Sequence, residues 1–262
     1  MLAAGIPTGV WALNVAASAI GLSLAASMEL WPGPARPLRR SAWWGALLVV
    51  PALLGATLLA QDVEGVHRWL RLGPIQIHAA AVLLPPLLVA LLEAPWKPAL
   101  VGAGAVLVLL MLQPDAAQAA AFCAAWIGIV AVRQEEGGAA VVAASVAVAV
   151  AAVFRPDPLE PVPHVEGIVG MAASQGSSLP VVALVSLAVL PLAQAFLLER
   201  SVGLVLATYT AVLLMAAWLG HHPVPVLGYG VSPILGYYGA VGLAFVLGRV
   251  GEGPASLTAA AV

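Results

Sequence analysis

The feature that most constrains this fold is a succession of long apolar segments separated by short polar ones. A helix that crosses the hydrocarbon core of a bilayer, about 30 Å thick, needs roughly 20 mostly apolar residues. Segments of about this length recur at 9–30, 43–61, 76–93, 98–113, 116–132, 139–154, 178–198, 203–219 and 232–249. They predict an all-α, polytopic transmembrane helical bundle of about nine spans. Eight spans are the alternative, because Pro114-Asp115 could lie inside one broken helix.

Composition supports this class. The chain is 62% hydrophobic and 8% charged, whereas soluble domains have about 45–50% apolar and about 25% charged residues. This excludes a water-soluble globular enzyme, a disordered chain and a nucleic-acid-binding module. No connecting segment is long enough for an extramembrane domain, so we expect residues 1–262 to form a single transmembrane domain. One cysteine, Cys123, rules out a disulfide framework, and we expect no cleaved signal peptide and no cofactor.

The charges of the connecting segments predict the orientation. The cations alternate between two sets, Arg36, Arg39, Arg40, Lys97, Arg133, Arg200 and Arg249 in one and Arg68, Arg71 and Arg155 in the other. The positive-inside bias places the larger set in the cytoplasm. The N-terminus is then outside and the C-terminus inside. All five histidines fall on or near the outer side: His67, His78, His164, His221 and His222.

Two of the outer segments carry a charge beside apolar residues. In 65–78, Arg68 and Trp69 form either an interfacial anchor or a rigid turn that holds the guanidinium toward an anionic lipid headgroup. A guanidinium can bind phosphate through two parallel hydrogen bonds, which suits a lipid pyrophosphate. In 110–118, Asp115 lies between two apolar runs. It is either the N-cap of a helix or a charge that faces a cavity.

Two further outer segments are rich in proline or glycine. Four prolines stiffen 155–167 and prevent regular helix. Glu166 follows them and precedes an apolar run, so it is either a solvated loop carboxylate or a carboxylate near a helix N-terminus at the interface. Segment 221–233 is either a connector or a re-entrant loop, because glycines flank Tyr229. The adjacent His221 and His222 lack further ligands, and we expect no metal site.

The order of these four segments resembles the SEDS family of cell-wall glycan polymerases. That family carries G-x-x-R-W-hydrophobic-x-L-G, L-x-Q-P-D, P-E-x-H-T-D-F-I and L-P-x-I-S-Y-G-G-S-S motifs in sequence. The corresponding segments here are 65–73, 112–115, 161–168 and 224–233. The resemblance spans most of the chain. It implies a bundle that lacks the family's first helix, and a location in the bacterial inner membrane.

The resemblance also implies an activity and a site. Family members polymerise lipid II at the outer face of the membrane, so the implied substrate is an undecaprenyl-linked lipid. Glu166 corresponds to the family's catalytic base, and Arg68 to its cationic contact to the lipid pyrophosphate. The remaining implied substrate-binding residues are Trp69, Asp115, His164, Tyr229 and Ser232. A single-pass transpeptidase or other membrane subunits are the implied protein partners.

The sequence departs from the family in four places. The Gly-Thr that follows the family's Pro-Asp reads Ala117-Gln118 here. The Q-P-S-E-L-A-K stretch that follows the Arg-Trp turn reads His78 to Leu84 here, without its Glu and Lys. The outer loop before the catalytic motif is short, and Asp has become Glu166. A non-catalytic scaffold or membrane subunit is therefore the second hypothesis. A transporter with Asp115 in its pathway is the third, although a transporter would carry more charges within its spans.

Overall fold

The computed structural model describes residues 8–30, 35–73, 75–160, 162, 165–176, 178–220, 222–227 and 230–248. The described elements are α1 (Thr8–Leu30), α2 (Ala35–Thr57), β1 (Trp69–Leu72), β2 (Ile75–His78), α3 (Ala79–Glu93), α4 (Trp96–Leu112), α5 (Ala116–Arg133), α6 (Gly138–Val153), α7 (Ile168–Gln175), α8 (Leu179–Leu197), α9 (Arg200–Trp218) and α10 (Val231–Gly248). The prediction of an all-α bundle is confirmed, because the one sheet in the described part is a short hairpin.

The long helices follow the predicted apolar segments closely. Four of them are long and apolar enough to cross a membrane, namely Trp11–Leu30, Ala116–Arg133, Leu179–Leu197 and Arg200–Trp218, and five further apolar helices are shorter. The protein is therefore a multi-pass membrane protein. Two elements differ clearly from the prediction. The segment expected to begin at Gln76 starts with β2 and becomes helical only at Ala79, and α2 begins at Ala35 and ends at Thr57 rather than spanning 43–61. The short helix α7 is not one of the nine predicted spans.

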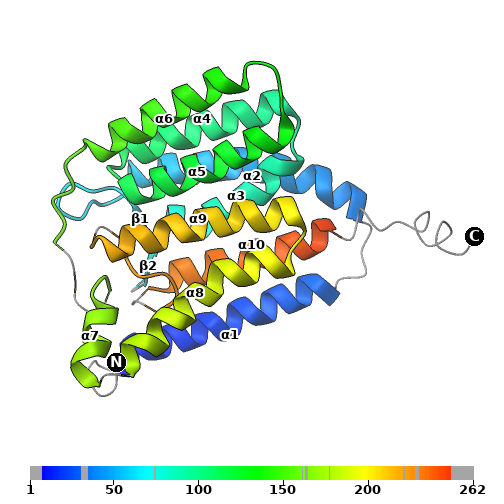
Figure 1. The fold of residues 1–262 in the computed structure, drawn as a ribbon. Helices are drawn as coiled ribbons and strands as arrows, with labels where there is room; N and C mark the ends of the chain where they lie inside the picture. Colours follow the sequence, from blue (N-terminus) through cyan, green and yellow to red (C-terminus); the bar gives the residue numbers. More distant parts are fainter. Residues whose placement is uncertain are drawn as a thin grey trace, which may run out of the picture.

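The bundle has two distinct ends (Figure 1). The long helices run along one another, and α7, the β1–β2 hairpin and the start of α10 all lie at the same end of the bundle, where the loop after α6 also begins. The described residues of the four segments that resemble family motifs therefore belong to this end, hereafter the hairpin end. Arg68, Arg71 and Arg155 belong to it, whereas Lys97, Arg133 and Arg200 belong to helix termini at the opposite end.

The core is centred on α3 and α5. Leu84, Leu87 and Leu88 of α3, with Phe122 and Trp126 of α5, are at most 1% exposed. Helix α10 packs between α1 and α3, and α9 packs between α5 and α8. Two polar pairs tie α9 to its neighbours: the hydroxyl of Tyr209 donates to Gln118 on α5, and the hydroxyl of Thr210 donates to Gln194 on α8 at 2.8 Å. Side-chain pairs of this kind stabilise helix packing in lipid by about 1 kcal/mol each.

Close packing of α10 against α3 depends on one glycine. A methyl group added at Gly236 would overlap the carbonyl oxygen of Ala81. We expect Gly236→Ala to lower the free energy of unfolding by about 1–3 kcal/mol, because backbone must move to relieve the overlap. Gly239→Ala on the same helix is the matched control, since it meets no atom within 4 Å. Unfolding in mixed micelles measures both, and equal stability of the two variants would contradict this contact.

Candidate functional site

The site begins with the β1–β2 hairpin, which holds Arg68 and His78 side by side. The strands pair antiparallel, with Trp69 opposite His78 and Leu72 opposite Ile75. Gly73 adopts φ +60° in the connection, a conformation that favours glycine. The backbone N–H of Ala79 donates to the carbonyl of Arg68 at 3.1 Å, which continues the pairing to the start of α3. The hairpin thus places residues from both strands beside the first turn of α3.

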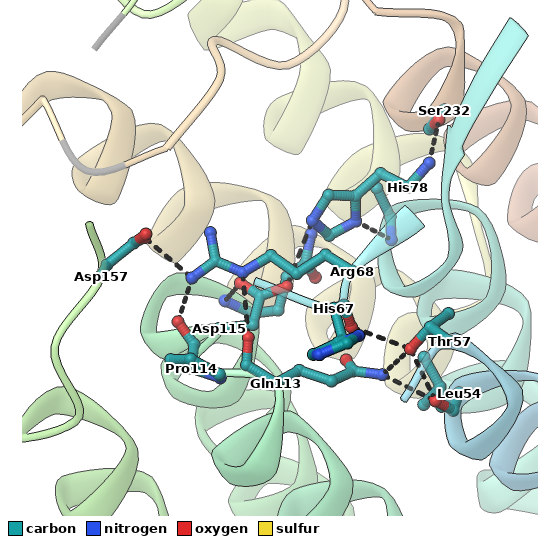
Figure 2. A network of polar contacts seen from close by, with 12 residues as sticks. Leu54, Thr57, His67, Arg68, His78, Gln113, Pro114, Asp115, Asp157 and Ser232 are labelled. Atoms are coloured by element: carbon teal, nitrogen blue, oxygen red, sulfur yellow. Dashed lines mark hydrogen bonds and ion pairs between the residues drawn. The ribbon is translucent and has the colours of Figure 1, made fainter. Parts of the chain in front are cut away.

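Arg68 is buried and already engaged by the protein. Its side chain is 10% exposed. Its Nε donates to the carbonyl of Gln113 at 3.2 Å, and its Nη2 donates to the carbonyl of Pro114 and to the Asp157 carboxylate, the latter at 2.8 Å. Figure 2 shows the guanidinium between Asp157 on one side and the α4–α5 turn on the other. Arg68 therefore joins the hairpin to the α4–α5 turn and to the proline-rich loop.

Asp115 is both a helix cap and a partner of a histidine. It is 2% exposed. One carboxylate oxygen accepts the N–H of Gln118 at 3.3 Å, as the N-cap of α5, and the other lies 3.2 Å from His78 Nε2. Burial by itself raises the pKa of Asp115, but the nearby charge of Arg68 and the interaction with His78 outweigh it and hold the pKa below its usual range. The carboxylate is ionised at neutral pH.

His78 connects four elements at once. Its Nδ1 accepts the N–H of Ala81 at 3.2 Å and so caps α3, which leaves Nε2 to carry the proton that faces Asp115. Its backbone N–H donates to the Ser232 hydroxyl at the start of α10 at 2.9 Å. Its ring meets Trp69 edge to face, with 5.7 Å between centroids. His78 is the residue that links the hairpin, α3, α5 and α10 (Figure 2).

A second network lies on the other side of Arg68. The Gln113 amide donates to the Thr57 hydroxyl at 2.6 Å and to the Leu54 carbonyl at 2.8 Å. The Thr57 hydroxyl in turn donates to the carbonyl of His67 at 2.9 Å. These contacts fix the end of α2 and the end of α4 against the residue that precedes Arg68, so the guanidinium is held from both directions.

His222 completes the polar cluster beside His78. It is 4% exposed, and its ring meets that of His78 edge to face, with 6.4 Å between centroids. Its Nε2 is buried and contacts no polar atom of the described residues. Burial lowers the pKa of His222 to about 4, although Asp115 opposes this shift. The imidazole is therefore neutral at pH 7 and can donate or accept one hydrogen bond.

The lowered pKa of His222 predicts a pH-dependent stability. The folded protein holds this ring neutral, whereas the unfolded chain binds a proton with a pKa near 6.5. Stability from this group is full above about pH 6.5 and falls as the pH drops toward 4, by at most about 1.4 kcal/mol per pH unit. Thermal unfolding at about pH 7 and about pH 5 should show a smaller loss in His222→Asn than in wild type. Equal losses in both proteins would contradict the assignment.

Glu166 lies in a turn that docks beside this cluster. Its Oε2 accepts the N–H of Val162 at 2.6 Å, and α7 begins two residues later with Gly167 as N-cap, which confirms the predicted position before a helix. The N–H of Val224 donates to the carbonyl of Val165 at 3.0 Å. Because Val224 is close in sequence to His222, this bond brings the Glu166 turn against the segment that carries the buried histidine.

The structure gathers only part of the predicted site. Arg68, Trp69, Asp115 and Ser232 meet around His78, and Asp115 combines the predicted N-cap role with a buried charge pair. Glu166 contacts its own loop rather than Arg68. The predicted site residues His164 and Tyr229 lie outside the described residues. Among the described residues, no group of three or more potential ligands is arranged for a metal ion.

Sequence reasoning missed four contributors to this network: Thr57, His78, Asp157 and His222. His78 and His222 were visible as outer histidines, but nothing along the chain paired either one with Asp115. Asp157 was visible only as one of several outer carboxylates. Thr57 carried no signal, because a single threonine at the end of an apolar helix is common.

The comparisons agree with this architecture. No family model and no curated protein sequence matches the chain. The solved structure of Thermus thermophilus rod shape determining protein RodA matches with a TM-score of 0.68 and 22% identity, over 94% of this chain and 90% of RodA. A point mutant of that protein matches with a TM-score of 0.67. A chain from a peptidoglycan synthase complex matches with a TM-score of 0.63 and 20% identity, over 92% of this chain and 90% of its own length.

The match extends over nearly the whole of both chains. The chain therefore has the fold of RodA, which is the fold that its resemblance to the SEDS family predicts.

Proposed function

We propose that the protein is a SEDS-like glycosyltransferase that extends a glycan from an undecaprenyl-linked substrate at the outer face of the bacterial inner membrane. The observation that carries this proposal is the RodA fold over 94% of the chain, together with the placement of the described residues of the four motif-like segments at one end of the bundle. The proposal includes the orientation inferred from charge, with the N-terminus outside and the C-terminus in the cytoplasm.

The proposed chemistry assigns Glu166 as the general base. Its carboxylate would take the proton from the acceptor sugar hydroxyl as that oxygen attacks the anomeric carbon, and the lipid diphosphate would leave. The bond from Val162 N–H holds one carboxylate oxygen and leaves the other to accept a proton. Arg68 would face the leaving diphosphate, while Trp69, Asp115, His164, Tyr229 and Ser232 would shape the substrate site around it.

A direct assay tests this function. Purified full-length protein in detergent or nanodiscs is incubated with lipid II, and the products are separated by gel electrophoresis. Glycan strands longer than the substrate are the expected result. Protein that retains its thermal unfolding transition but yields no polymer, alone and with a co-expressed single-pass transpeptidase, would contradict the proposal. The transpeptidase is the partner class suggested by the similarity to a chain of a peptidoglycan synthase complex.

A second candidate function is a non-catalytic membrane subunit. Two observations favour it. The positions of the family's Glu and Lys are taken by Ala81 and Leu84, which are 4% and 0% exposed. The carboxylate and the cation that the family carries at these two positions are therefore absent from α3. Arg68 also donates hydrogen bonds to the Gln113 carbonyl and the Asp157 carboxylate of the protein itself. A stable complex with a membrane partner in the absence of polymerase turnover would favour this alternative.

A further inference from the structure

We propose that Asp157 occupies the position of an anionic ligand group on Arg68. A diphosphate would displace the Asp157 carboxylate from Arg68 and bind in the adjacent cavity, which Arg155 lines. Nothing in the motif resemblance assigns a role to Asp157 or Arg155, since both lie in the shortened loop where the family's pattern is lost. The inference rests on the proposed function for the identity of the lipid, but the binding chemistry follows from the contacts alone.

The first step concerns the two carboxylates near Arg68. Asp115 is 2% exposed and is used by His78 and by the cap of α5. Asp157 is different, because its side chain is 38% exposed while the Arg68 side chain is 10% exposed. It reaches Arg68 from a loop rather than from a helix, at 2.8 Å (Figure 2). An exposed loop carboxylate on a buried guanidinium is the partner that a soluble or lipid-borne anion can replace at least cost.

The second step concerns the donors that Arg68 has left. Its Nε and Nη2 bond to the α4–α5 turn and Asp157, whereas its Nη1 donates to none of the described residues. When Asp157 moves away, Nη1 and Nη2 can donate two parallel hydrogen bonds to two oxygens of one phosphate group. The bonds to the carbonyls of Gln113 and Pro114 remain and keep the guanidinium in place. The hairpin therefore presents a preorganised cation.

The third step is the space beside the pair. A cavity of about 440 Å³ is lined by Gly65, Val66, Pro114, Arg155, Pro156 and Pro158. These residues flank both partners of the ion pair, because Pro114 bonds to Arg68 and two prolines flank Asp157. Small-molecule sites commonly measure roughly 300–1,000 Å³. Three prolines make its walls stiff, so little order is lost when a ligand binds.

The fourth step is the charge of the wall. Arg155 is exposed and lines the cavity, and its side chain forms no hydrogen bond or ion pair with the described residues. With Asp157 displaced, the cavity combines Arg155 with the free edge of Arg68, which suits an anion that carries two phosphate groups better than a single carboxylate. The shared chemistry is a diphosphate, either the headgroup of a polyprenyl lipid or free pyrophosphate.

The test measures binding and does not depend on turnover. The full chain is placed in nanodiscs of zwitterionic lipid and titrated calorimetrically with inorganic pyrophosphate and with farnesyl diphosphate. We expect Asp157→Asn to bind about three- to fivefold more tightly than wild type, because the competing charge is gone. The amide oxygen still accepts the Leu159 N–H that Asp157 accepts at 3.2 Å. We expect Arg155→Gln to bind about three- to tenfold more weakly.

Matched controls separate these effects from a change in overall charge. Glu160→Gln removes a carboxylate from the same loop, and Arg71→Gln removes an exposed cation from β1. Both should change the affinity less than about twofold at physiological salt, because the interaction between exposed charges is largely screened beyond about 8 Å. Thermal unfolding verifies that each variant folds, and Asp157→Ser replaces Asp157→Asn if that variant fails to fold.

The outcomes are distinct. Tighter binding by the Asp157 variant supports the site, and a preference for farnesyl diphosphate over pyrophosphate identifies the lipid headgroup as its source. Unchanged or weaker binding by that variant, equal tightening in Glu160→Gln, or no binding of either probe overturns the inference. Binding with the expected pattern in a protein that forms no polymer would refute the proposed function and leave the site standing.

Discussion

Glu166→Gln is expected to lower the rate of glycan polymerisation by about 100-fold or more. A positioned general base contributes roughly 10²–10⁴-fold to rate, and the amide cannot take a proton. The substitution preserves shape, and the amide oxygen can still accept the Val162 N–H that Glu166 accepts at 2.6 Å. Loss of activity would therefore not come from loss of the turn. The measurement is initial-rate polymerisation of lipid II by the folded variant and by wild type.

Two further variants sharpen this prediction. Glu160→Gln changes the same type of residue in the same loop and should retain near-wild-type turnover. Glu166→Asp keeps a carboxylate and should therefore retain more activity than Glu166→Gln. It should still be slower than wild type, because the side chain is one methylene shorter and a displacement of about 1 Å can cost up to the order of 100-fold in rate. Wild-type turnover in Glu166→Gln would contradict the assignment of Glu166 as general base, although it would support the proposed polymerase activity.

The second large effect is expected at Asp115. Asp115→Ala should lower the free energy of unfolding by about 3–5 kcal/mol, because it removes one member of a buried charge cluster and leaves Arg68 and His78 without it. It also removes the cap on the Gln118 N–H. Asp115→Asn keeps a capping oxygen and should be about 1 kcal/mol less damaging. Equilibrium unfolding in mixed micelles measures all three proteins.

The pH dependence and a second substitution test the cause of this effect. Since the folded-state pKa of Asp115 is lowered, its contribution is present above its usual pKa near 3.8 and is lost as the pH falls below that value. Wild type and Asp115→Ala should therefore converge in stability in acid. A double-mutant cycle with His78→Ala should show coupling of about 0.5–3 kcal/mol. Additive effects would mean that the two side chains do not act together.

The order of spans could be predicted because it depends on local properties. Apolar length marks each helix, and the break at Pro114-Asp115 is a true helix boundary, with α4 ending at Leu112 and α5 starting at Ala116. The capping role of Asp115 also follows from its position before an apolar run, and the structure confirms it through the Gln118 N–H. These features need only neighbours in the chain.

The β1–β2 hairpin was not predicted, although a signal was present. Apolar and polar residues alternate in Leu70 to Leu72 and in Ile75 to His78, and the register leaves two residues between the strands. Alternation around a two-residue connection is typical of a hairpin. Ile77 also suits the beginning of the next span, and it lies inside the predicted helical segment 76–93. The consequence is that His78 ends a strand and caps a helix rather than lying inside one.

The contacts of the site depend on residues far apart in the chain. Arg68 and Asp157 are separated by 89 residues, and His78 and Ser232 by 154. No periodicity or motif encodes which loop carboxylate reaches a given guanidinium, because that choice depends on how the loops lie once the bundle has packed. Arg68 illustrates this, since the sequence indicates an anion contact but not that a carboxylate of the chain itself makes it.

By itself, the sequence determined that this chain is a multi-pass helical bundle with its charged and proline-rich segments on alternating sides, because apolar length and loop charge act locally. Only the tertiary structure decided that Asp115 and His78 share a buried contact, that Asp157 covers Arg68, and that the Glu166 turn docks on the segment of His222. Burial creates those pairings: a charge removed from water must find its partner among whatever groups the packed helices bring within reach.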